Sequence, residues 1–221
     1  MNKKRIDLSH SITDGLITYK GLPAPIICDY LSREDSKKFY PEGTSFQIGR
    51  INMIANTGTY LDCPFHRYEQ GADLSELLLE QVSGLDAVCI QFDYEKNGLS
   101  IEPKHIEQIN LKGKAVLLHT GWSKHWNTDK YFEQHPFLSE AAALYLQQQN
   151  VALVGIDSHN IDDTRGNSRP AHSILLGNNI LIVEHMTQLH LLPSSGFDFY
   201  AVPPKVQGMG TFPVRAFAEL K

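Results

Sequence analysis

Three short apolar runs in the second half of the chain constrain its fold most strongly. They read "KAVLLHTG" at 114–121, "VALVGID" at 151–157 and "NILIVEHM" at 179–186. A short run of this kind, apolar at almost every position, is typical of a strand that is buried on both faces. The segment "DAVCIQF" at 86–92 also predicts a strand. We therefore expect a sheet of largely buried strands at the centre of the molecule.

The segments between these strands predict helices. Residues 138–150, "LSEAAALYLQQQN", are rich in Ala, Leu and Gln, and Ser139 stands where an N-cap belongs. A shorter helix is predicted at 71–84, where leucines recur at helical spacing before Gly84. Another is predicted at 101–110, where a proline falls in the first turn.

Both ends of the chain have more strand character. Residues 5–12 and 46–55 alternate apolar and polar side chains, which favours strands with one buried face. Strands that alternate with helices over 85–190, framed by β-rich ends, indicate an α/β fold. We expect a mixed sheet, curled toward a barrel with flanking helices, in a single domain spanning 1–221.

The charge balance disfavours two classes of partner. Twenty Lys and Arg against 25 Asp and Glu give a formal net charge of -5, with no long block of either sign. Such a surface is not suited to nucleic acid or to an anionic membrane. The chain also lacks a signal-peptide pattern and a run of apolar residues long enough to span a bilayer. With three widely spaced cysteines, these features favour a cytoplasmic protein with reduced thiols.

Glu184 is unusual because it interrupts the apolar run at 179–186. A carboxylate inside a buried strand must be paired or must bind a cation. One interpretation is an ion pair with Arg165, Arg169 or Arg215, and the other is a metal-binding or catalytic role.

Two further polar groups stand near predicted strand ends. Asp62 lies in "NTGTYLDCPFH" at 56–66, and His172 lies near the end of the long polar loop 157–173. Together with Glu184 they form a mixed nitrogen and oxygen set that suits a divalent ion. Within the loop, His159 and Asp162 are expected to order the chain or to support the metal ligands.

Seven segments of the chain, in order, resemble one known family. They read "DLSHSI", "NTGTYLDCPFH", "VLLHTGW", "VGIDSHNID", "AHSILLG", "ILIVEHMTQL" and "FDFYAVPPKVQGMGTFPVRAFA". On these segments, which are distributed over residues 6–218, the chain resembles the cyclase family that includes kynurenine formamidase. The resemblance implies a swivelling β/β/α fold, a homodimer or homotetramer, and divalent-metal-dependent hydrolysis of small amides, lactones or related cyclic substrates.

The resemblance also implies roles for particular residues. In the family motif His-x-Gly-Thr-His-x-Asp-x-Pro-x-His, the two leading histidines fall on Asn56 and Tyr60, so both are absent here. The remaining positions imply Asp62 as a metal ligand and His66 as the general acid and base. The distal ligands of the family fall on His172 and Glu184, and an aromatic substrate-holding position falls on Tyr19.

Loss of two histidines implies a reduced metal site. In the dinuclear members those histidines hold one of the two ions, so Asp62, His172 and Glu184 are expected to hold one remaining ion. Two carboxylates and one imidazole make Mn²⁺ and Mg²⁺ competitors of Zn²⁺. Asn56 is expected to add an amide oxygen to the substrate site, and Tyr60 to act as an oxyanion donor.

Two alternatives to a mononuclear metallohydrolase stay open. One is metal-free hydrolysis by Tyr60 and His66, with Asp62 orienting the imidazole. The other is a ligand-binding protein without catalytic activity on the same fold, which the two missing histidines also suggest.

Overall fold

The middle of the chain folds into four parallel strands whose side chains alternate between two cores. In the computed structural model, which describes residues 3–40, 43–107 and 110–221, these strands lie in the order β5, β7, β9, β10. In β7, Ala115 and Leu117 pack into one core, and Val116 and Leu118 pack into the other. Burial on both faces explains why these strands read as continuous apolar runs, and it confirms the predicted strands.

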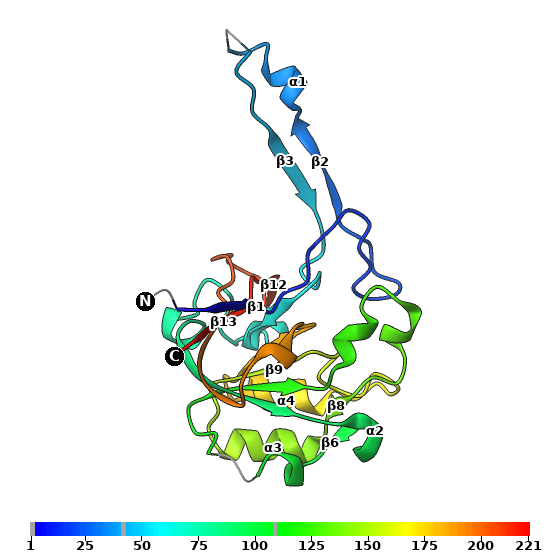
Figure 1. The fold of residues 1–221 in the computed structure, drawn as a ribbon, viewed down its shortest axis with the longest axis vertical. Coiled ribbons are helices and arrows are strands. Elements are labelled where there is room, and N and C mark those ends of the chain that lie inside the picture. The colour runs from blue at the N-terminus through cyan, green and yellow to red at the C-terminus, as the bar shows by residue number, and fades with distance from the viewer. Residues whose placement is uncertain (1–2, 41–42, 108–109) are drawn as a thin grey trace.

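Antiparallel strands extend this centre on both sides. Beyond β5 lie β11, β13 and β1, and beyond β10 lie β4 and β12, so that nine strands form one sheet (Figure 1). The predicted mixed sheet with flanking helices is therefore confirmed. The strands are β1 (Arg5–Asp7), β2 (Ile26–Leu31), β3 (Ile48–Asn52), β4 (Tyr60–Asp62), β5 (Leu85–Gln91), β6 (Ser100–Ile101), β7 (Ala115–His119), β8 (Phe137–Leu138), β9 (Leu153–Ile156), β10 (Leu181–Glu184), β11 (Ser195–Tyr200), β12 (Thr211–Pro213) and β13 (Phe217–Leu220).

The α-helices are α1 (Arg33–Ser36), α2 (Tyr94–Asn97), α3 (Glu140–Gln148) and α4 (Pro170–Gly177). Helix α3 confirms the prediction for 138–150, and the Ser139 side chain caps it by accepting a hydrogen bond from the Ala142 N–H. Helices α3 and α4 pack against each other and bury side chains in the same core. Among the described helices, none combines the length and the apolar character that a bilayer crossing requires.

The helix predicted at 71–84 is wrong. Only a 3-10 turn forms there, at Leu79–Gln81. The Asp73 carboxylate accepts hydrogen bonds from the Ser75 N–H and from the Gly208 N–H, which holds the chain in a turn instead of a first helical turn. The helix predicted at 101–110 is reduced to a 3-10 turn at Pro103–His105, and its residues 108 and 109 lie outside the described residues.

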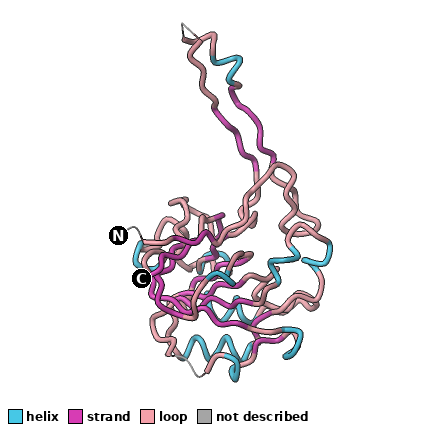
Figure 2. The backbone as a smooth tube through the Cα atoms, in the orientation of Figure 1, coloured by secondary structure: helices cyan, strands magenta, loops and turns pink. Residues whose placement is uncertain are grey.

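Strands β2 and β3 form a hairpin arm that projects from the body of the molecule, with α1 near its tip (Figures 1 and 2). The arm contains the strand predicted at 46–55, but the pairing of this strand with β2 was not predicted. Large apolar side chains along the arm are exposed, including Ile26 and Ile51, each 58% exposed, and Tyr30, 75% exposed. The arm therefore carries an apolar surface that the body of the chain does not cover.

Candidate active site

The pairing of β4 with its neighbours brings four polar side chains together. Tyr60 lies opposite Glu184 of β10, and Asp62 lies opposite Thr211 of β12. Residues that are opposite each other in antiparallel strands point to the same face, as do residues two apart in one strand. Tyr60, Asp62, Thr211 and Glu184 therefore share one face of the sheet. Ile182, which is opposite Asp62, lies in the core covered by α4, so this is the face toward α4.

Helix α4 delivers His172 to this face, and Asp162 orients it. The Asp162 carboxylate accepts hydrogen bonds from the N–H groups of Ala171 and His172 at 2.7 and 3.0 Å, which caps the helix. The same carboxylate lies 2.6 Å from His172 Nδ1. The ring is thereby turned so that Nε2 lies 3.8 Å from an oxygen of Asp62 and 3.8 Å from an oxygen of Glu184. Asp162 therefore orders the chain at the start of α4, as predicted, and its support of a metal ligand stays a prediction.

Glu184 is completely buried and is held by neutral donors. Its Oε1 accepts a hydrogen bond from the Ile161 N–H at 2.6 Å, and its Oε2 accepts one from the Tyr60 hydroxyl at 2.5 Å. The Tyr19 hydroxyl lies 3.2 Å from the same Oε2. In the part of the chain that the structure describes, no arginine pairs with Glu184. Arg165 binds Asp163 and Arg215 binds Asp7, so the ion-pair interpretation of Glu184 is wrong.

The charges of His172 and Glu184 depend on each other. Burial disfavours the charged form of His172, but its hydrogen bond to the Asp162 carboxylate and the negative charges of Glu184 and Asp62 outweigh burial and raise its pKa. Burial raises the pKa of Glu184, while the nearby charge of His172 lowers it. Without a bound ion, the site thus balances its carboxylates with a proton on His172.

Tyr60 and Tyr19 are both neutral donors at this site. Burial, together with the charge of Glu184, raises the pKa of each phenol well above its ordinary value. The two hydroxyls lie 2.7 Å apart. Tyr60 is only 1% exposed, and its hydroxyl donates a hydrogen bond directly to the Glu184 carboxylate. The roles predicted for Tyr60 as an oxyanion donor and for Tyr19 as a substrate-holding residue stay predictions.

His66 is oriented by Thr211, a residue that the sequence did not single out. The Thr211 hydroxyl donates its hydrogen to Asp62 Oδ1, and its oxygen lies 2.8 Å from His66 Nδ1. Because a hydroxyl has one hydrogen, the oxygen of Thr211 must accept from the N–H at Nδ1 of His66. This leaves Nε2 of His66 unprotonated in the neutral ring, which is the state that a general base needs.

The donor set fits a divalent metal ion. Asp62 Oδ2 is buried and has no hydrogen-bond partner among the described residues, which is costly for a carboxylate unless a cation neutralises it. His172 Nε2 faces this oxygen. Ligand atoms of Asp62, His66 and His172 all lie within 4.8 Å of one another. Two sets of three metal ligands are therefore compatible with the structure. Both contain Asp62 and His172, and the third ligand is either His66 or Glu184.

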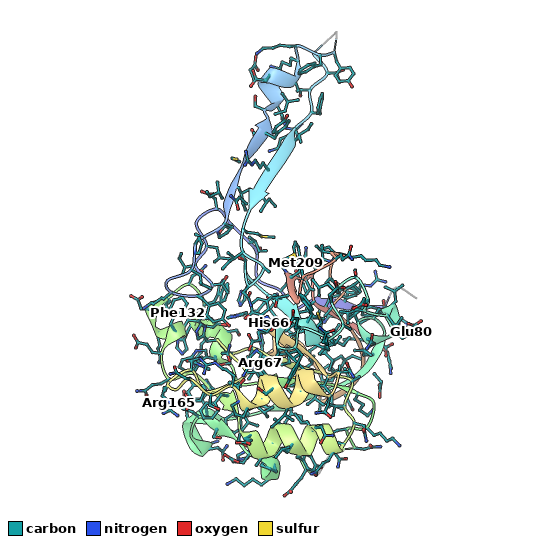
Figure 3. All side chains as sticks on the ribbon, turned by 180° about the vertical axis from the view of Figure 1, so that it is seen from behind. His66, Arg67, Glu80, Phe132, Arg165 and Met209 are labelled. Carbon is teal, nitrogen blue, oxygen red and sulfur yellow. The ribbon has the colours of Figure 1, made fainter. Side chains whose placement is uncertain are left out.

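These groups line one cavity of about 310 Å³, within the size range of small-molecule sites. Tyr19, Asn56, Tyr60, His66, His172 and Glu184 all line it, so the structure brings the predicted substrate and catalytic residues together. Four further lining residues were not predicted as site residues, namely Leu22, Arg67, Asn160 and Arg169. Figure 3 shows His66 and Arg67 near the middle of the body, below the arm.

The chain is similar in sequence and in fold to several known proteins. The family model described as "Putative cyclase" matches residues 6–163. The chain is 32% identical over 178 residues to the kynurenine formamidase of Geobacillus thermodenitrificans, covering 79% of this chain and 81% of that protein. It is 26% identical over 212 residues to the kynurenine formamidase of Bacillus cytotoxicus, covering 96% and 95%. A solved structure described as a potential metal-dependent hydrolase with cyclase activity superposes with a TM-score of 0.79 at 25% identity, covering 100% and 99%.

Proposed function

The chain belongs to the cyclase family and is a hydrolase, and we propose that it cleaves a small amide, lactone or related cyclic substrate with one divalent metal ion. The observation that carries this proposal is the buried Asp62 oxygen that has no hydrogen-bond partner in the described residues. This oxygen lies 3.8 Å from His172 Nε2, which in turn lies 3.8 Å from Glu184. Two carboxylates and an imidazole around an open cavity are the ligands of a catalytic metal site with a free position.

Asp62, His172 and Glu184 are the residues that hold the ion in this proposal. A divalent ion in such a site lowers the pKa of water and polarises a carbonyl oxygen. Because oxygen ligands outnumber nitrogen ligands, Zn²⁺, Mn²⁺ and Mg²⁺ are all candidates. The substitution of Asn56 and Tyr60 for the histidines of the family motif supports one ion rather than two. The Tyr60 hydroxyl on Glu184 also supports this, because it satisfies a carboxylate oxygen without a second cation.

His66 supplies the proton transfer in this proposal. Its Nε2 accepts a proton from the attacking water and returns it to the leaving nitrogen or oxygen of the substrate. Thr211 and Asp62 keep the ring in the required tautomer through the hydrogen bonds described above. Tyr19 and Leu22 form a wall of the same cavity against which the body of the substrate packs.

The first prediction tests hydrolysis and its metal dependence together. We expect turnover of at least one substrate in a panel of aryl formamides, lactones and cyclic imides after loading with Zn²⁺, Mn²⁺ or Mg²⁺. Because Asp62, His172 and Glu184 are proposed to hold one ion, elemental analysis should give about one ion per chain, and a chelator should abolish turnover. Full activity in chelator that is lost in Tyr60→Phe would instead support metal-free hydrolysis. Binding of panel members without turnover under any metal would support a catalytically silent protein.

The hairpin arm supports a homodimer or homotetramer, which we also propose. A two-stranded hairpin is at best marginally stable by itself in water. Its apolar side chains Ile26, Tyr30 and Ile51 are exposed, with Ile26 and Ile51 on opposite faces of the hairpin, and the rest of the described chain does not cover them. Since most soluble oligomers are symmetric assemblies of identical chains, a second copy is the partner that this arm fits.

The second prediction concerns this assembly. The double variant Tyr30→Asp/Ile51→Asp is expected to be monomeric in analytical ultracentrifugation, because two charges on the apolar arm oppose its burial against another copy. The matched control is Leu144→Asp, since Leu144 on α3 is also exposed, at 42%, but lies outside the arm. An assembly that persists in the double variant would contradict a role for the arm.

We further propose a cytoplasmic location and a small-molecule substrate. The three cysteines are free, as expected in a reducing compartment. The cavity is of a size for a small molecule, and the net charge of -5 disfavours nucleic acid.

A further inference from the structure

Two arginines line the same cavity as His66, and the mechanism does not use them. They are Arg67, which directly follows His66, and Arg169, which directly precedes α4. We infer that they form a subsite for a carboxylate of the substrate, so that the natural substrate is an anionic amide or lactone. This inference rests on the proposed function, because hydrolysis at His66 defines where the scissile bond lies. Binding of a carboxylate to the two arginines can be tested separately.

Arg67 is held in place without being neutralised. Its Nε donates to the Ser173 hydroxyl of α4 at 3.2 Å. In the described ranges of the chain, no carboxylate forms an ion pair with Arg67. Nε is a single donor of the five on a guanidinium, so donors remain for a ligand in the cavity.

Arg169 is fixed even more firmly, again by neutral groups. Its Nη1 donates to the backbone carbonyls of Asp163, Gly166 and Ser168 at 3.2, 2.8 and 2.6 Å. Carbonyl oxygens hold the guanidinium but leave its positive charge uncompensated. Since its other nitrogens are not among these donors, they are available to a ligand in the cavity.

Three other arginines of the body behave differently. Arg5, Arg165 and Arg215 each bind a carboxylate of the protein at 2.7 or 2.8 Å. The two arginines of the cavity are thus distinguished from these by the lack of an acidic partner among the described residues. A guanidinium presents donors in a fixed fork that matches a carboxylate, which is why paired arginines recognise this group.

The net charge of the chain explains why an anionic substrate needs such a subsite. The whole chain carries a net charge of -5, so an anion is repelled as it approaches. Two guanidinium groups at the cavity offset that repulsion locally. A neutral substrate does not require them. The substrate class that fits is therefore an amide or lactone with a carboxylate beside its scissile carbonyl and an apolar body that packs on Tyr19 and Leu22.

The test compares a charged and a neutral substrate with the same formamide group, 2-formamidobenzoate and its methyl ester. The wild-type protein is expected to hydrolyse the acid with a kcat/KM at least about tenfold higher, since hydrogen bonds to charged groups are strong. Arg67→Gln and Arg169→Gln should each raise KM for the acid about tenfold or more, while the ester changes little. Arg169→Lys, which keeps the charge, should recover part of the loss. The control Arg165→Gln removes an arginine that is already paired with Asp163, and it should change neither substrate.

A binding measurement separates this inference from the proposed hydrolysis. Calorimetric titration with benzoate and with benzamide, with and without chelator, should show benzoate binding that weakens in Arg67→Gln and Arg169→Gln but not in Arg165→Gln. Equal binding of benzoate and benzamide to the wild type, or unchanged benzoate binding in both variants, would overturn the carboxylate subsite. Arginine-dependent benzoate binding without turnover of any substrate would uphold the subsite and count against hydrolysis.

Discussion

Replacing Asp62 by Asn is expected to remove the metal ion and to lower kcat by about 10²–10³-fold, the equivalent of several kcal/mol. The reason is that Asp62 Oδ2 is the buried carboxylate oxygen left without a partner in the described residues, and it faces His172 Nε2. An amide oxygen still accepts the hydrogen bond from Thr211, so the orientation of His66 is preserved. Elemental analysis and steady-state kinetics on the same preparation measure both effects.

Thermal unfolding gives an independent measure of the same prediction. Metal at about 100 times its Kd should stabilise the wild type by about 2.7 kcal/mol, which corresponds to a Tm increase of roughly 5–11 °C for a chain of this length. The Asp62→Asn variant should show no such increase. Asp86→Asn, on a half-buried pair with Lys114 outside the cavity, serves as the control. An unchanged ion content in Asp62→Asn would contradict the assignment.

The parts of the fold that were predicted correctly are those where local pattern and burial coincide. The strand at Ala115–His119 and the helix at Glu140–Gln148 are examples, because both are apolar where the structure buries them. The helix predicted at 71–84 failed because leucine spacing is compatible with a helix, while the contact of Asp73 with Gly208, 135 residues away, is invisible to a local pattern. Helix α4 was missed for a related reason. Its first turn is capped by Asp162, which lies eight residues before it starts and belongs to a polar loop.

In the candidate site, too, the residues that belong to a sequence motif were predicted, and those that depend on long-range contacts were not. Asp62, His66, His172 and Glu184 were identified through the family motif. In the structure, His66, His172 and Glu184 line one cavity, and Asp62 is buried beside His172. Thr211 was not singled out, because its contact with Asp62 depends on the register of β12 on β4. Arg67 and Arg169 were likewise missed as site residues. The available signal was position, because Arg67 follows His66 and Arg169 precedes Pro170. Such a position does not identify a binding residue until the structure shows the cavity and the lack of acidic partners among the described residues.

Replacing His66 by Ala is expected to lower kcat by about 10²–10⁴-fold, the usual contribution of a general acid and base. The fold should survive, because the His66 side chain is 33% exposed and lies at the end of a 3-10 turn. His190→Ala, an exposed histidine outside the cavity, is the matched control and should keep wild-type activity. Activity in His66→Ala that equals the control would contradict the proposed role.

The metal content of His66→Ala decides between the two ligand sets that overlap in this site. If Asp62, His172 and Glu184 hold the ion, His66→Ala retains about one ion per chain while it loses turnover, because proton transfer and metal binding are then separate tasks. If His66 is itself a ligand, as its distance to Asp62 and His172 permits, ion and activity disappear together. Thr211→Val sharpens the distinction, since it removes the acceptor for the N–H at Nδ1 of His66 without touching the ring. If His66 is a general base that depends on its tautomer, the Thr211→Val variant should lose about tenfold or more in kcat and still bind the ion. The reason is that Thr211 is a positioning residue, which acts only through the His66 ring that it orients.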